Sequence, residues 1–172
     1  MNLNIPYMET DNKLLNDAYR IAAGDIVGNI VYYQNGLLTE EKPCMIAGLD
    51  YNTPWTRDTA INIWNALSIL SPEVSKNTLL AVLEEEEGNI YIGGQYWDSI
   101  IWMIGAREYC RFHKDDNFYR LAFKAGRNSV HRLEEDEFDE EDGLFRGPAV
   151  YGDGIAAYPD KYSKCPNQGS GI

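Results

Sequence analysis

The segment that most constrains the fold of this chain is apolar on nearly every side of a helix. Its apolar members are Trp97, Ile100, Ile101, Trp102, Met103, Ile104 and Ala106. With their neighbours, these positions predict a helix from Gln95 to about His113. A helix with almost no polar face is buried on more than one side. We therefore expect it to belong to the inner of two layers of helices.

Four further helices are predicted from apolar residues that recur every three or four positions and from helix-end signals. They span about 11–34, 56–70, 72 to the acidic run at 84–87, and 116 onward, with Asp11, Ser71, and Asp115 or Asp116 as N-caps. Prolines and glycines between Leu37 and Pro54 indicate a long loop, and the acidic run indicates a solvated loop edge. The expected fold is all-α, a series of antiparallel helical hairpins.

Composition excludes several classes of partner and cofactor. The 172 residues carry 27 acidic and 15 basic side chains, a net charge of −12, which disfavours nucleic acid and anionic membrane surfaces. Three cysteines share no CxxC spacing, and the two histidines lie in no metal-binding motif, so we expect neither a metal nor a cofactor. The N-terminus shows no signal peptide and no apolar stretch is long enough for a membrane span. These features predict a cytoplasmic protein.

The first candidate site lies where the second helix begins. Trp55 offers a flat apolar ring, Arg57 a rigid fork of hydrogen-bond donors, and Asp58 a pair of acceptors. Sugars need this combination, because their hydroxyl groups require donors and acceptors while their C–H face stacks on a ring. The alternative is structural: Asp58 would stabilise the start of the helix, with Arg57 as its ion-pair partner.

Two further segments could contribute to the same site. Tyr96, Trp97 and Asp98 stand at the start of the apolar helix, although Trp97 could equally pack in the core and Asp98 could serve the helix dipole. Asp153 lies between two glycines, which leave it sterically open, but an Asp-Gly turn has the same pattern. Asp160, next to Pro159, is a weaker candidate of the same kind.

The stretch from Tyr51 to Ala60, YNTPWTRDTA, resembles the aromatic-x-Trp-x-Arg-Asp-x-Ala signature of six-hairpin, (α/α)6-barrel glycosidases of the glucoamylase-like superfamily. The resemblance implies that Arg57 and Asp58 hold sugar hydroxyls, with Trp55 beside them. Tyr96 to Asp98 is similar to the next helix-start segment of that family. Asp153 lies roughly where those relatives place the general acid.

This resemblance implies an inverting, exo-acting glycoside hydrolase with a carbohydrate substrate, whose toroid would be incomplete in 1–172. The chain would form a single partial domain, because those relatives take their catalytic base from a later hairpin. We therefore expect little turnover from the chain by itself, and either self-association or completion by missing C-terminal hairpins. The alternative is a non-catalytic helical module that binds sugar or protein.

Overall fold

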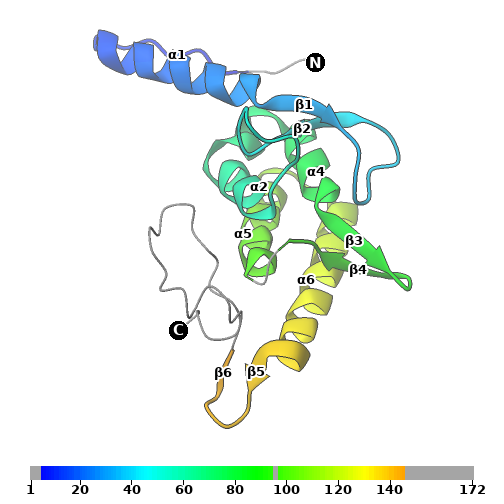
Figure 1. Ribbon diagram of the computed structural model, residues 1–172. Coiled ribbons are helices and arrows are strands. Elements are labelled where there is room, and N and C mark those ends of the chain that lie inside the picture. The colour runs from blue at the N-terminus through cyan, green and yellow to red at the C-terminus, as the bar shows by residue number, and fades with distance from the viewer. Residues whose placement is uncertain (1–4, 95–96, 146–172) are drawn as a thin grey trace.

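The computed structural model describes residues 5–94 and 97–145, and it combines helices with small sheets (Figure 1). The elements in chain order are α1 (Lys13–Gly28), β1 (Ile30–Tyr33), β2 (Lys42–Met45), α2 (Thr56–Asn62), η1 (Ile63–Leu67), α3 (Ser68–Leu70), α4 (Pro72–Ala81), β3 (Leu83–Glu86), β4 (Asn89–Ile92), α5 (Asp98–Phe112), α6 (Asp116–Glu137), β5 (Phe138–Asp139) and β6 (Leu144–Phe145). The strands form three two-stranded antiparallel sheets. The prediction of an all-α toroid of antiparallel hairpins is therefore wrong.

The first sheet forms where the sequence predicts the end of a long helix. Helix α1 is capped by Asn12 rather than Asp11, and it ends at Gly28 instead of continuing to Gln34. Strand β1 follows at once and pairs with β2 inside the predicted loop, with Ile30 opposite Met45. The run Ile-Val-Tyr-Tyr consists of β-branched and aromatic residues, which favour a strand once a partner is available.

The second sheet takes up the acidic run. Strands β3 and β4 pair from Leu83 opposite Ile92 to Glu86 opposite Asn89. Glu87 and Gly88 connect them with positive φ angles of 50° and 78°, the conformation of a tight two-residue hairpin turn. The run is therefore the exposed part of a hairpin and not a loop edge, since cross-strand hydrogen bonds outweigh the low strand propensity of glutamate.

Several helix boundaries agree with the sequence prediction because their signals are local. Helices α2, η1 and α3 follow one another without a break from 56 to 70, with a π-helical segment in the middle. Ser71 caps α4, with its Oγ accepting the Val74 N–H at 3.4 Å. Asp115 caps α6, with Oδ1 accepting the Phe118 N–H at 3.0 Å.

Helices α2 and α5 run parallel and in contact. Arg57 pairs with Asp98 near their first residues, and His113, just after α5, donates from Nε2 to the carbonyl oxygen of Ser68 at 2.6 Å. Between these points Gly105 lies against Ala60, where an added Cβ would be 2.8 Å from the Ala60 Cα. The parallel arrangement brings both helix N-termini to the same end of the structure.

The core forms around α5, which carries the largest set of buried residues among the described helices. Trp102 is fully buried and donates from Nε1 to the carbonyl oxygen of Leu79 at 3.3 Å. Ile100 and Ile104, however, remain 42% and 39% exposed, so one side of α5 is uncovered within the described residues. Within residues 5–94 and 97–145, no helix combines the length and the hydropathy required to span a bilayer.

Candidate functional site at the N-terminal ends of α2 and α5

The centre of the candidate site is a buried ion pair between two helix starts. Arg57, in the first turn of α2, donates from Nη1 to Oδ1 of Asp98, the first residue of α5, at 2.7 Å. The Asp98 side chain is 2% exposed and that of Arg57 is 22% exposed. The two residues are 41 positions apart in the chain. Charge-assisted hydrogen bonds of this kind are strong, and burial restricts the two side chains to one relative orientation.

Trp55 covers the arginine. The Arg57 Cζ lies 5.7 Å from the centre of the Trp55 ring, within the range of a cation–π contact, and Tyr51 meets the same ring edge-on with centroids 6.0 Å apart. The indole N–H of Trp55 is buried and has no hydrogen-bond partner in the described part of the chain. A buried donor left unpaired costs about 1–3 kcal/mol, so this ring is held in place by its packing.

Gly93 and Gly94, which follow β4, form another wall of the site. Thr56 Oγ1 donates to the carbonyl oxygen of Gly93 at 2.8 Å. Gly94 has a φ of 113°, which only glycine adopts readily, and a Cβ there would be 2.6 Å from Asp98 Oδ2 and 2.8 Å from Thr56 Oγ1. Gly94 therefore lets the backbone lie directly against the buried carboxylate.

These walls enclose a small pocket that opens beside a larger one. The first has a volume of about 170 Å³ and is lined by residues that include Trp55, Thr56, Gly94 and Asp98. The second has a volume of about 320 Å³. The pockets share three wall residues, Glu84, Gly93 and Gly94, so they are neighbours.

Carboxyl groups line the larger pocket. Glu84, Asp136 and Glu137 all contribute to its wall. Burial raises the pKa of Glu137 above its ordinary value, and the neighbouring Asp136 charge raises it further. Sequence reasoning missed Glu84 because it assigned the acidic run to a solvated edge. The alternation of Ile90, Tyr91 and Ile92 after Glu87-Gly88 was the signal that could have revealed the hairpin.

The structure brings together three of the residues that the sequence nominates: Trp55, Arg57 and Asp98. Asp58 is half-buried in the first turn of α2, outside the residues that line the two pockets. Trp97 is also half-buried and meets the ring of Phe145 edge-on at 6.3 Å between centroids. Tyr96, Asp153 and Asp160 lie outside the described residues.

The site offers hydrogen-bond donors, acceptors and an aromatic ring. Within the described residues, no group of three His, Cys, Asp or Glu side chains is placed to hold a metal ion. Comparison with protein-family models, with curated proteins and with solved structures finds no match to this chain.

Proposed function

We propose that the cluster of Trp55, Arg57 and Asp98 binds a carbohydrate, as the sugar-holding part of a glycoside hydrolase of the glucoamylase-like superfamily. The observation that carries the proposal is the 2.7 Å Arg57–Asp98 pair at two adjoining helix starts, covered by a tryptophan ring and bordered by a pocket. The YNTPWTRDTA motif supports the same assignment.

The chemistry of the cluster suits vicinal hydroxyl groups. A guanidinium has five N–H donors, and the hydrogen bond from Nη1 to Asp98 uses one of them. The pair with Asp98 holds the guanidinium plane in one orientation, so its other donors need little further ordering when a hydroxyl binds. Trp55 supplies the ring on which a C–H face could stack.

Hydrolysis needs more than this cluster. Glycosidases that invert configuration use two carboxyl groups on opposite sides of the scissile bond, one of which must remain protonated. Asp153 remains our candidate for the acid on the resemblance alone. Among the described residues, Glu137 lines the pocket next to the cluster, and burial raises its pKa in the direction that favours the protonated acid.

The second candidate function is a non-catalytic sugar-binding module. The observation that favours it is that Asp98, the buried carboxylate at the centre of the cluster, is already paired with Arg57. A carboxylate held in this way orients a donor and is not free to activate water. The three cysteines, of which Cys44 and Cys110 are unpaired in the structure, fit the cytoplasm as the proposed compartment for either function.

The test is calorimetric titration with a panel of oligosaccharides. We expect Arg57→Gln to weaken binding by about tenfold or more, since a hydrogen bond to a charged group contributes about 1.5–3 kcal/mol. Trp55→Leu should also weaken binding, because it removes the ring on which a C–H face would stack. Arg111→Gln is the matched control, because Arg111 also forms an ion pair at 3.0 Å, with Glu108, but outside the site. Circular dichroism would verify that the variants fold. Unchanged sugar binding in both site variants would exclude this cluster as the binding site.

Hydrolysis of a panel of aryl glycosides separates the two candidates. Turnover that falls in Glu137→Gln or Asp153→Asn would support the hydrolase and identify the acid. Sugar binding with no turnover above background is expected both of the module and of a hydrolase whose toroid is incomplete in 1–172, and it would leave the binding proposal intact; only measurable turnover separates the two.

A further inference from the structure

Each of the two larger hairpins has a second strand whose outer edge is covered by a helix. Among the described residues no third strand pairs with β2 or with β4. On β2, the Pro43 carbonyl oxygen accepts from Nδ2 of Asn77 at 3.2 Å, and two positions further along the Met45 N–H donates to Oγ1 of Thr78 at 3.0 Å. Adjacent residues of α4 thus satisfy two backbone groups on one strand edge. We call Asn77 and Thr78 the α4 dyad.

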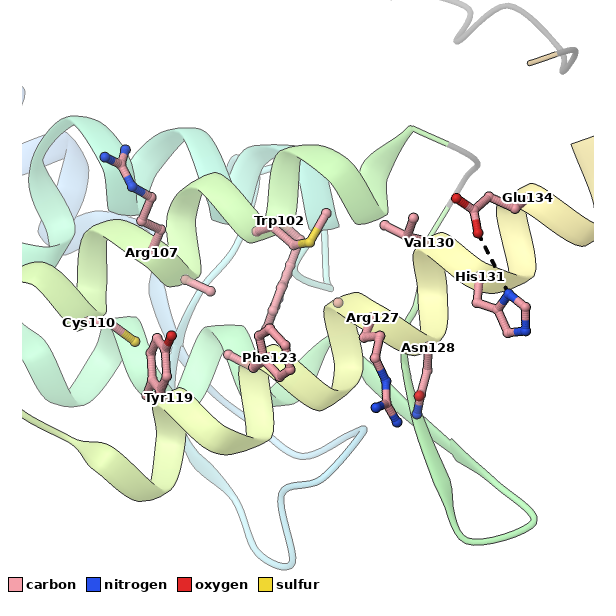
Figure 2. A pocket seen from close by; sticks show the side chains of 14 residues that line it. Trp102, Arg107, Cys110, Tyr119, Phe123, Arg127, Asn128, Val130, His131 and Glu134 are labelled. Carbon is pink, nitrogen blue, oxygen red and sulfur yellow. Dashed lines mark ion pairs between the residues drawn. The ribbon is translucent and has the colours of Figure 1, made fainter. Parts of the chain in front are cut away.

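Helix α6 covers the edge of β4 with the same arrangement. Nδ2 of Asn128 donates to the Ile90 carbonyl oxygen at 3.1 Å. Two positions further along the strand, the Ile92 N–H donates to Oγ of Ser129 at 2.8 Å. Figure 2 shows Asn128 leaving α6 on the side of the β3–β4 hairpin. We call Asn128 and Ser129 the α6 dyad; like the α4 dyad, it consists of an asparagine followed by a hydroxyl residue.

The two hairpins also begin and end in the same way. Asn29, which follows α1, has φ and ψ of −92° and 8°, and Val82, which follows α4, has −104° and 7°. The carbonyl oxygen of Asn29 accepts the N–H of Ile46 at 2.9 Å. That of Val82 accepts the N–H of Gly93 at 2.8 Å, and in both cases the donor directly follows the second strand. In both hairpins the first residue of the first strand lies opposite the last residue of the second.

These correspondences define a unit of a helix, a hairpin and a second helix, which is present as α1–β1–β2–α2 and as α4–β3–β4–α5. A tryptophan, Trp55 or Trp97, directly precedes the second helix of each unit. The hairpin edge of the first unit is covered by α4, the first helix of the second unit, and the hairpin edge of the second unit is covered by α6. The first strands, Ile-Val-Tyr-Tyr and Leu-Glu-Glu-Glu, share no residue type, so the backbone and the dyads reveal a repeat that the strand sequences do not.

We propose that the two dyads are equivalent edge caps of a repeated unit, and that the α6 dyad positions the Gly94 wall of the candidate site. Only one residue separates Gly94 from Ile92, whose N–H the α6 dyad holds, and a Cβ on Gly94 would be 2.6 Å from Asp98 Oδ2. A movement of β4 would therefore change the contact between Gly94 and the buried carboxylate. The α4 dyad holds β2, which the segment 46–55 separates from the site. The edge caps are independent of the carbohydrate proposal, whereas the positioning role rests on it.

Amide hydrogen exchange, measured by NMR on the full chain, tests the edge caps one at a time. Thr78→Val and Ser129→Ala each remove a hydroxyl that accepts a strand N–H. Exchange should become about fivefold faster or more at Met45 in the first variant and at Ile92 in the second, with the other amide at its wild-type rate, because an unpaired buried N–H disfavours the closed hairpin. Thr78→Ser keeps the hydroxyl and should keep the wild-type rate at Met45. The edge caps are overturned by wild-type rates at both amides in both variants, or by equal acceleration of both amides in either variant, which would report only a general loss of stability.

Calorimetric titration with the oligosaccharide panel tests the positioning role. Ser129→Ala and Asn128→Ala should each weaken binding by about threefold or more, toward the lower end of the effect of one hydrogen bond, whereas Thr78→Val should bind as the wild type does. Asn128 lines neither pocket of the site, so an effect there does not come from a lost contact with the sugar. Wild-type affinity in Asn128→Ala, or an equal loss in Thr78→Val, would overturn the positioning role. A wild-type chain that binds no sugar would overturn it together with the carbohydrate proposal, and the exchange rates would still decide the edge caps.

Discussion

The contact between Gly105 of α5 and Ala60 of α2 can be tested with a single methyl group. An ideal Cβ on Gly105 would lie 2.8 Å from the Ala60 Cα, 3.1 Å from its carbonyl oxygen and 3.3 Å from its Cβ. Two of these atoms belong to the backbone, so no side-chain rotation relieves the overlap. In Gly105→Ala the two helices must therefore separate.

Two opposing effects determine how much Gly105→Ala changes the free energy of unfolding. Alanine is favoured over glycine within a helix by about 1 kcal/mol. Forcing an extra methyl into a well-packed contact costs about 1–3 kcal/mol. The overlap with backbone atoms places this site toward the upper end of that range, so we expect Gly105→Ala to lower the free energy of unfolding by about 1–2 kcal/mol. The carbohydrate binding that we propose should weaken as well, because Arg57 and Asp98 are held on the same two helices.

Two other helical glycines supply controls, because an added methyl group can be accommodated more easily at each of them than at Gly105. At Gly126 an added Cβ would meet Met103 Sδ at 2.7 Å, but that atom belongs to a flexible side chain that can move. At Gly24 in α1, nothing lies within 4 Å. Urea unfolding should therefore rank the alanine variants Gly105, Gly126, Gly24 in order of increasing stability, with Gly24→Ala above wild type by up to about 1 kcal/mol. A Gly105→Ala variant as stable as Gly126→Ala would refute the close α2–α5 contact.

Three further predictions concern charge and burial. Arg57→Ala should lower the free energy of unfolding by about 3 kcal/mol because it removes the cationic partner of the buried Asp98 carboxylate. A urea double-mutant cycle with Asp98→Ala should depart from additivity by more than about 1 kcal/mol. Hydrogen bonds from the Lys76 side chain and from the Phe118 backbone N–H lower the pKa of Asp115 below its ordinary 3.8 in the folded protein. The ionised carboxylate therefore contributes its full stabilisation above pH 3.8, and this stabilisation is lost as the pH falls through the lowered pKa of the folded state. Asp115→Asn should consequently cost most stability at pH 7 and progressively less as the pH falls below 3.8, and a cost that stays constant as the pH falls would contradict the linkage. Burial raises the pKa of the Cys44 thiol to about 12, and iodoacetamide should modify Cys110 in the folded protein well before it reaches Cys44, as mass mapping of the peptides would show.

The sequence alone determined the helix boundaries that depend on local signals. Ser71 followed by Pro72 predicts the start of α4, and Asp115 predicts the start of α6, because a capping side chain satisfies N–H groups only two or three residues away. The apolar segment around Trp102 likewise predicts α5 as the helix at the core. The capping interactions lie within one turn of helix, so a short stretch of sequence contains all the information that determines these helix starts.

Pairing between distant segments decided the rest. Ile30–Tyr33 continues a helical pattern in sequence and becomes a strand only because Lys42–Met45 lies beside it. Arg57 has an acidic neighbour at the next position, yet the carboxylate that accepts from its Nη1 at 2.7 Å is that of Asp98, brought in by the parallel packing of α2 and α5. The apolar face of α1 predicts burial and remains exposed. Periodicity states that a face is apolar, but only the positions of the other elements determine what covers it.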